Sequence, residues 1–277
     1  EVVAVGGSSV FSALKQGSGT SVDQAAIQAL PSINGNIQDY MRLDPRVAFV
    51  DRASGTISAG GQNPRFNQVT IDGIAASDTF GLEGNNMPTK RQPVSMEAIE
   101  AIDISLSNYD VTIAGAAGAN VNAVTKSGGN EFHGSVYGSF RDGDWFGKDP
   151  TGAEFNGFEK EQTYGMTFGG PLVKDKLFLF AMYEYRDNDA RNTNALGTSM
   201  NYADSGNGFW GAKLDWQIND DHLLELLAFS DEGESVTENY RYDFDTRERG
   251  DYVGKTTSES GGKNGSLTYT GHFGENF

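Results

Sequence analysis

Residues 162–186 read QTYGMTFGGPLVKDKLFLFAMYEYR, and this stretch decides the fold. It contains two strand-like runs, Gln162–Gly170 and Leu177–Arg186, joined by a short polar connection. In the first run Tyr164, Met166 and Phe168 alternate with small or hydroxyl-bearing residues. Side chains alternate between the two faces of a strand, so this run has one apolar and one polar face. The stretch therefore predicts an antiparallel hairpin.

Four further strand-like runs flank this hairpin, and the connections between all six alternate in length. The other runs are Phe132–Arg141, Asn207–Gln217, His222–Ser230 and Asn264–Gly271. The connections are long (142–161), short (171–176), long (187–206), short (218–221) and long (231–263). Outer-membrane barrels have short periplasmic turns and long extracellular loops. The rhythm therefore favours a membrane barrel over a soluble domain of two β-sheets, which gives no reason to sort its loops by length.

Charged residues orient the strands of this barrel. Glu184 and Arg186 share one side of their strand, and a charge facing lipid costs about 2–4 kcal/mol at the bilayer midplane. Leu177, Leu179, Ala181, Tyr183 and Tyr185 are therefore expected to face outward. In the run Asn207–Gln217, four side chains are expected to face lipid, namely Trp210, Ala212, Leu214 and Trp216. Lys213, Asp215 and Gln217 of the same run are expected to face the interior. The two tryptophans are separated by roughly 20 Å along the strand, which allows an aromatic girdle at each interface.

Composition narrows the class of protein. The chain has 277 residues, 37% of them hydrophobic, and its longest apolar stretches fall short of the roughly 20 residues of a spanning helix. It has no cysteine, which excludes disulfides and thiolate metal sites. A formal charge of −17 argues against a nucleic-acid partner. Six strands are too few to close a barrel around a folded domain, so we expect the front part of a longer polypeptide.

Residues 1–130 lack the loop rhythm and predict a separate small α+β domain. Thr20 or Ser21 is expected to cap a helix that runs to Leu30, a second helix is expected over Ile37–Leu43, and Ser95 is expected to cap a short helix over Ser95–Ile99. Strands are expected at Thr56–Ala59, Phe66–Ile71, Ala101–Leu106 and Asn120–Thr125. The glycines of Gly115–Gly118 permit a close backbone approach or unusual backbone dihedrals. The loop Lys126–Asn130 marks the boundary to the barrel, residues 131–277.

Several motifs occur in an order that resembles one family. They are Asn67–Gly73 (NQVTIDG), Pro93–Ile104 (PVSMEAIEAIDI), Tyr109–Val111 (YDV), Gly118–Gly128 (GANVNAVTKSG), Asn130–Gly134 (NEFHG) and Gly169–Phe180 (GGPLVKDKLFLF). This series resembles the plug domain and first barrel strands of TonB-dependent outer-membrane receptors, most closely the Oar-like subgroup. The resemblance covers residues 20 to 190 well and the remainder only by strand rhythm.

The resemblance implies a fold and a function. It implies an α+β plug domain followed by about six strands of a barrel of about 22, in the outer membrane of a Gram-negative bacterium. The expected partners are membrane lipid, TonB on the periplasmic side with ExbB and ExbD acting through it, and an extracellular ligand such as an iron chelate, cobalamin, an oligosaccharide or a peptide. The apical loops would be Gly60–Gln68 and Ser77–Gln92. The candidate ligand-binding residues in them are Gln62, Asn63, Arg65, Asp78 and Phe80.

Other functions find less support in the sequence. A TonB-contacting segment is not evident before residue 20, so an Oar-like surface component for adhesion or complex formation is an alternative to a transporter. A soluble acidic β-rich binding module is the third possibility. No catalytic, metal or cofactor site is predicted, because His133, His222 and His272 are isolated in the sequence. An enzyme is therefore the least supported class.

Overall fold

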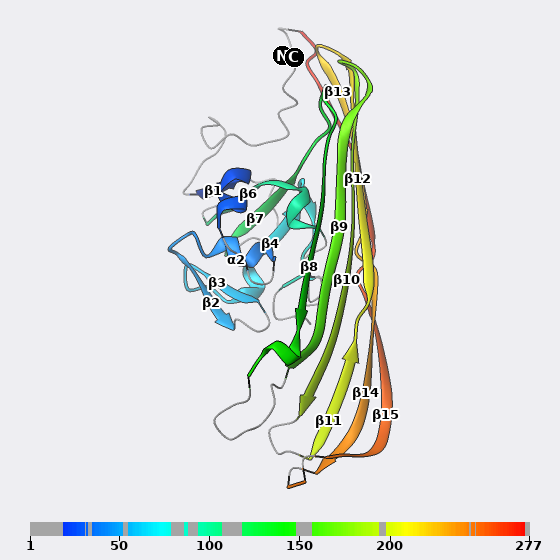
Figure 1. Ribbon diagram of the computed structural model, residues 1–277. Helices are drawn as coiled ribbons and strands as arrows, with labels where there is room; N and C mark the ends of the chain where they lie inside the picture. Colours follow the sequence, from blue (N-terminus) through cyan, green and yellow to red (C-terminus); the bar gives the residue numbers. More distant parts are fainter. Residues whose placement is uncertain are drawn as a thin grey trace.

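A computed structural model provides the fold of most of the chain (Figure 1). It describes residues 19–30, 32, 35–51, 55–78, 86–87, 94–106, 118–147, 157–193, 198–243, 245–246 and 248–274. Two bodies are visible, an N-terminal unit (described residues between 19 and 126) and a tall curved sheet formed by strands between residues 133 and 271. Among the described residues, none of the helices has the length and apolar character needed to cross a membrane.

The N-terminal unit mixes short helices with a sheet, as the sequence predicts. Its elements are β1 (Gly19–Asp23), α1 (Gln24–Ala29), α2 (Ile37–Met41), β2 (Val47–Asp51), β3 (Thr56–Ala59), η1 (Pro64–Phe66), β4 (Gln68–Ile71), β5 (Ile74–Ala75), η2 (Met96–Ala98), β6 (Ile99–Ser105) and β7 (Asn120–Thr125). Within the described part, five strands form one sheet in the order β1-β6-β7-β4-β5, and β2 and β3 form a separate hairpin. β4 and β7 are parallel, and the other neighbours are antiparallel.

Local sequence signals explain most of these boundaries, with one clear correction. The helix predicted from Thr20 or Ser21 begins later, because both residues belong to β1, which pairs with β6. Asp23 is the N-cap instead, and its Oδ1 accepts a hydrogen bond of 2.8 Å from the Ala26 N–H. Ser95 caps η2 as predicted, accepting from the Glu97 N–H at 3.2 Å. Side-chain oxygens at these positions satisfy backbone donors that a helix leaves free at its start.

Smaller differences concern strand ends and two missed strands. β3 and β7 occupy the predicted residues, whereas Phe66 lies in η1 rather than in the predicted strand. The strands β2 and β5 were not predicted. Of the glycine stretch, only Gly118 lies inside the described residues, and a Cβ there would lie 3.2 Å from the Phe66 carbonyl carbon and oxygen and 2.6 Å from the Asn67 Oδ1. The predicted close backbone approach is therefore confirmed at Gly118.

The second body is one large sheet. Its elements are β8 (His133–Asp142), η3 (Gly143–Trp145), β9 (Gly157–Val173), β10 (Leu177–Thr193), β11 (Ser199–Asp204), β12 (Asn207–Asn219), β13 (His222–Ser230), β14 (Gly233–Asp243), β15 (Glu248–Ser260) and β16 (Lys263–Gly271). Over the ranges that the structure describes, these nine strands belong to one sheet with antiparallel pairing. The strands thus form one open sheet, not the two facing sheets of the soluble alternative.

The nine strands follow six long paths, because three pairs continue one another. β11 continues into β12, and both pair with β10. In the same way β13 continues into β14, and β15 continues into β16. The interruptions lie at 205–206, 231–232 and 261–262, and the partner registers run through them without a shift. At the last interruption Gly261 has φ +81°, and a Cβ there would lie 2.2 Å from the Asp231 carbonyl oxygen. Only glycine fits this position.

The long connections predicted at 187–206 and 231–263 are wrong as loops. Most of their residues continue the strands, so that β10 runs to Thr193 and a long β14–β15 hairpin follows. We call residues 187–193, 199–204, 233–243 and 248–260 the extension. Figure 1 shows that it projects past the N-terminal unit, at the end of the sheet opposite the β12–β13 turn.

The faces of the sheet agree with the orientation predicted from charge. Trp210 and Trp216 are exposed on the outer face, whereas Lys213 and Asp215 are buried on the inner face. Glu184 on β10 is also buried, at 2% exposure. Figure 1 shows the N-terminal unit lying beside this sheet. Phe180, Met182, Phe209, Leu227 and Phe229 of the inner face share one buried cluster with the core of the N-terminal unit, whose members include Ile71, Ile102 and Val121.

Candidate functional site

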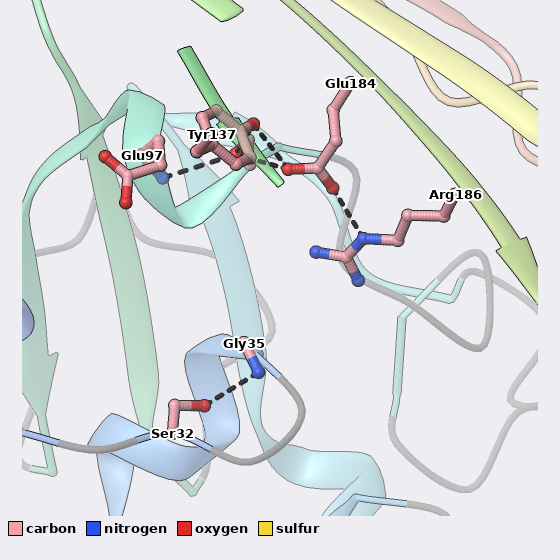
Figure 2. A network of polar contacts seen from close by, with 7 residues as sticks. Ser32, Gly35, Glu97, Tyr137, Glu184 and Arg186 are labelled. Atoms are coloured by element: carbon pink, nitrogen blue, oxygen red, sulfur yellow. Dashed lines mark hydrogen bonds and ion pairs between the residues drawn. The ribbon is translucent and has the colours of Figure 1, made fainter. Parts of the chain in front are cut away.

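A polar network joins the N-terminal unit to the sheet through Glu184 (Figure 2). The Glu184 Oε2 accepts hydrogen bonds from the Ser95 Oγ at 2.7 Å and from the Tyr137 hydroxyl at 2.5 Å. The Arg186 Nε lies 2.5 Å from the Glu184 Oε1 and forms an ion pair with it. A buried carboxylate is stable only when its charge is paired and its oxygens are hydrogen-bonded. This network meets both conditions.

Each residue of this network comes from an element that fixes its position. Tyr137 and Glu184 lie on the inner faces of β8 and β10, and Ser95 lies at the start of η2. The Ser95 Oγ also lies 2.5 Å from the Tyr137 hydroxyl. Ser95 therefore caps η2 and contacts the sheet with the same oxygen. We call Ser95, Tyr137, Glu184 and Arg186 the Glu184 network.

A second polar contact joins Asp72 to Lys213. Asp72 follows β4 in a left-handed backbone conformation, with φ 46°. Its carboxylate accepts from the backbone N–H of Thr125 at 2.9 Å and from the Thr125 hydroxyl. The Lys213 Nζ on β12 lies 3.6 Å from the Asp72 Oδ2, and the Lys213 side chain is only 5% exposed. This contact orders the Asp72 turn and places a buried lysine between the two bodies.

Asp44 stabilises the N-terminal unit away from the sheet. Its buried carboxylate accepts from the Thr20 hydroxyl at 2.8 Å and from the Arg46 Nε at 2.8 Å. The hydrogen bonds from Arg46 hold the pKa of Asp44 well below its ordinary value of 3.8, and they outweigh burial, which raises it. Asp44 thereby links β1 to the turn after α2.

The five residues predicted to bind ligand are only partly described. Gln62, Asn63 and Arg65 lie in the exposed turn after β3 and in η1, where the Asn63 Oδ1 accepts from the Arg65 N–H at 3.0 Å. The Asp78 N–H donates to the Asn86 carbonyl at 3.1 Å. Phe80 lies outside the described residues. The structure brings Gln62, Asn63 and Arg65 together on one turn.

A cavity of about 410 Å³ lies elsewhere in the N-terminal unit. It is lined by both apolar and polar residues of α1, α2, η2 and their surroundings, among them Ile27, Tyr40, Met96, Glu97 and Lys126. Burial lowers the pKa of Lys126. Figure 1 shows β1 toward the end of the unit nearer the β12–β13 turn, and β2 and β3 toward the extension.

Two histidines of the described part lie close to oxygen atoms, and three aspartates lie close to one another. The His222 Nδ1 lies 2.7 Å from the Tyr269 hydroxyl, and the His133 Nδ1 lies 3.3 Å from the Glu131 carbonyl oxygen. Asp187, Asp189 and Asp204 place carboxylate oxygens within 4.8 Å of one another. Asp187 accepts a hydrogen bond of 2.6 Å from the Gln162 side chain.

Sequence reasoning missed the contacts between the two bodies. It placed Glu184 and Lys213 on the inner face and Ser95 at a helix start, but Ser95 and Glu184 are 89 residues apart. Tyr137 was not singled out. A buried charge on a strand face is the one signal that indicates a partner across the interface, and it does not identify that partner.

Relatives of known sequence lie among outer-membrane receptors. Residues 124–208 match a family described as "Outer membrane beta barrel domain". The TonB-dependent transporter Oar of Myxococcus xanthus is 30% identical over 204 residues, which cover 61% of this chain and 19% of that protein. The probable TonB-dependent siderophore receptor PirA of Acinetobacter baumannii is 27% identical over 239 residues, covering 77% of this chain and 29% of that protein. The chain thus spans less than a third of the length of these curated relatives.

Solved structures of low sequence identity share the fold. The siderophore receptor PirA of Acinetobacter baumannii has a TM-score of 0.59 at 18% identity, over 87% of this chain and 43% of that one. A mutant of the ferric enterobactin receptor PfeA of Pseudomonas aeruginosa has a TM-score of 0.60 at 16% identity, over 94% and 39%. The transporter YddB of Escherichia coli has a TM-score of 0.55 at 17% identity, over 82% and 37%. In sequence and in fold, this chain is therefore similar to the TonB-dependent receptors and transporters of the outer membrane, the Oar transporter among them.

Proposed function

We propose that this chain contains the plug domain and the first barrel strands of a TonB-dependent outer-membrane transporter. In this proposal residues 1–130 form the plug and residues 131–277 belong to the barrel. The observation that carries it is the two-faced sheet, which exposes Trp210 and Trp216 on one side and holds the N-terminal unit through Glu184 and Lys213 on the other. A wide barrel needs such an obstruction, because an empty lumen would leak.

The two buried polar contacts explain why transport would need an energy source. Glu184, Tyr137 and Arg186 all lie on the sheet, so separating the two bodies there breaks the hydrogen bonds of Ser95, which costs about 1.5–3 kcal/mol for a bond to a charged group. Breaking the buried Asp72–Lys213 pair costs about 3–5 kcal/mol. If both must open, the cost is roughly 4.5–8 kcal/mol, and spontaneous opening is rarer than about one in 10³. Work done by TonB, driven by the inner-membrane proton gradient, would supply this free energy.

The proposed ligand site lies on the extracellular side of the plug. Figure 1 shows the β2–β3 hairpin on the side of the N-terminal unit that faces the extension. Gln62, Asn63 and Arg65 follow this hairpin and are exposed. Together with Asp78 and Phe80 they remain our candidates for the first contact with an extracellular ligand.

A pair of experiments tests this function. Deleting residues 19–126 from the full-length receptor is expected to raise the conductance of planar bilayers that contain it, and unchanged conductance would refute the plug assignment. The purified periplasmic domain of TonB is expected to bind the intact receptor. A receptor that binds no TonB and functions normally in cells without TonB would instead be a surface component for adhesion or complex formation.

A further inference from the structure

The extension separates charged and uncharged residues onto opposite faces. Residues directly opposite each other in a ladder share a face, as do residues two apart along a strand. Because Glu184 faces the N-terminal unit, Asn188, Ala190 and Asn192 on the same strand occupy the inner face. The registers run on through the strand interruptions, so the faces of β11, β14 and β15 follow from their partners.

The inner face of the extension carries rows of amides and hydroxyls. One row is Asn192, Asn201 and Asn239, which are successive partners across β10, β11 and β14. In the next rows Thr237 pairs with Thr256, and Ser235 with Ser258. Neighbours in such rows lie about 5 Å apart, and successive rows about 7 Å apart. The amides of the first row span β10, β11 and β14. In the Thr237 row the partners on β11 and β10 are Ala203 and Ala190, so the hydroxyls of that row lie on β14 and β15.

The outer face of these same strands carries the charges. Eight charged residues lie there: Asp187, Asp189, Arg191, Asp204, Glu234, Glu238, Lys255 and Glu259. In the three described rows of the inner face none of the residues is charged, and charge returns only at Arg241, one row nearer the tip. A surface that only needs to stay hydrated has no reason to confine charge to one side.

The charged residues that border these rows on the side of the N-terminal unit are paired with one another. Arg186 is paired with Glu184, and Arg141 with Glu161, whose partner across the ladder is Asn188. A ligand that reaches these three rows therefore meets mainly amides and hydroxyls, and the cationic group nearest to them on the tip side is Arg241, one row away. Anionic ligands are normally bound by such cationic groups, which donate charge-assisted hydrogen bonds.

Resting on the proposed transport function, we propose that the inner face of the extension binds a neutral, polyhydroxylated ligand of the oligosaccharide class. Asparagine, serine and threonine side chains each donate and accept hydrogen bonds, and so does a sugar hydroxyl. An anionic ferric chelate offers mainly acceptors and would leave the acceptor oxygens of the rows unpaired, which is costly in a desolvated site. A peptide would bring charged and apolar side chains that these rows do not complement.

The test uses the purified full-length receptor and a defined set of probes. Maltohexaose, cellohexaose, chitohexaose and a wider array of neutral oligosaccharides are compared with ferric enterobactin. At least one neutral oligosaccharide is expected to bind, with an affinity that changes less than twofold between low and physiological salt, since uncharged partners are not screened. Binding of ferric enterobactin alone, or of no neutral oligosaccharide on the array, would overturn the proposal.

Matched substitutions locate the binding surface. Asn201→Ala and Asn239→Ala, each with a thermal melt to show that the receptor is folded, are expected to weaken oligosaccharide binding at least tenfold. Asp204→Asn, on the outer face of the same strand, is expected to change it less than twofold. Equal effects on the two faces would overturn the proposal. These measurements require no TonB. The proposed ligand class can therefore fail while the bilayer conductance test still supports the plug assignment.

Discussion

Glu184→Gln tests the Glu184 network most sharply, because glutamine keeps the shape of the side chain and removes only its charge. The native carboxylate is 2% exposed and accepts from Ser95, Tyr137 and Arg186. After the substitution Arg186 has lost its buried counter-charge, while the amide oxygen still accepts one hydroxyl. Breaking a buried pair costs about 3–5 kcal/mol, and the retained hydrogen bond places this change near the lower value.

The expected loss is visible in the amides that the network orders. The Glu97 N–H donates to the Ser95 Oγ, and the Lys126 N–H donates to the Ala98 carbonyl at 2.8 Å. If the network limits local opening, a loss of about 3 kcal/mol raises the exchange rate of these amides about 100-fold, because each 1.4 kcal/mol is a factor of ten. Hydrogen exchange of the full-length receptor, in detergent or liposomes, measures this directly.

Asp187→Asn is the matched control. It removes a carboxylate from the outer face of the same strand, where its hydrogen-bond partner is Gln162. Surface changes of this kind are usually within about 0.5 kcal/mol, so the same amides should change by little more than twofold. Exchange in Glu184→Gln that stays within fivefold of the native receptor, or that equals the control, would refute the claim that this network holds the N-terminal unit on the sheet.

Three further substitutions test other parts of the structure. Lys213→Met should destabilise the receptor by about 3 kcal/mol in urea unfolding, because the Asp72 carboxylate, 13% exposed, loses its lysine and keeps only its hydrogen bonds from Thr125. Lys263→Met, in an exposed pair, should cost at most about 1 kcal/mol. Equal costs would contradict a difference in burial between the two pairs. Gly261→Ala should destabilise the extension by about 1–3 kcal/mol or more in thermal melts, because the backbone is left-handed and the added Cβ meets a carbonyl oxygen. Gly262→Ala, which has open space around it, should change the stability little. A neutral Gly261→Ala would show that the interruption at 261–262 is not as described. The pKa of Asp44 is lower in the folded than in the unfolded state, so its contribution to stability is present above about pH 4 and is lost as the pH falls below that value. Asp44→Asn should therefore flatten the fall in melting temperature of the N-terminal unit at acid pH. An unchanged fall at acid pH would contradict the prediction.

The sequence predicted those elements whose signals are local. Ser95 is recognisable as a helix cap, and β3 and β7 lie between clear turn signals. The outward face of β12 was predicted because lipid demands apolar residues, so that Trp210 and Leu214 alternate with buried charges. The membrane imposes this alternation, which is why the faces of the spanning strands could be predicted.

The extension could not be predicted, because that constraint ends with the membrane. Asp187 and Asn188 follow each other on β10 with polar side chains on both faces, as do Glu234 and Ser235 on β14. Without an apolar face the two-residue period disappears from the sequence, and such stretches look like loops. The contacts of Ser95 with Glu184 were equally hidden, since no local pattern joins residues so distant in the chain.

We propose that one face of the sheet meets lipid and the other holds the N-terminal unit, and spin labels on the two faces distinguish these environments. The chain has no cysteine, so single cysteines at Leu226 and Asp215 can be labelled in the full-length receptor in liposomes. We expect the label at Leu226 to collide with dissolved oxygen and not with a water-soluble nickel chelate, and the label at Asp215 to be shielded from oxygen and to gain access to the chelate once residues 19–126 are deleted. Access of the chelate to the label at Leu226 in the intact receptor, or no gain of access at Asp215 after the deletion, would contradict this arrangement of the two faces.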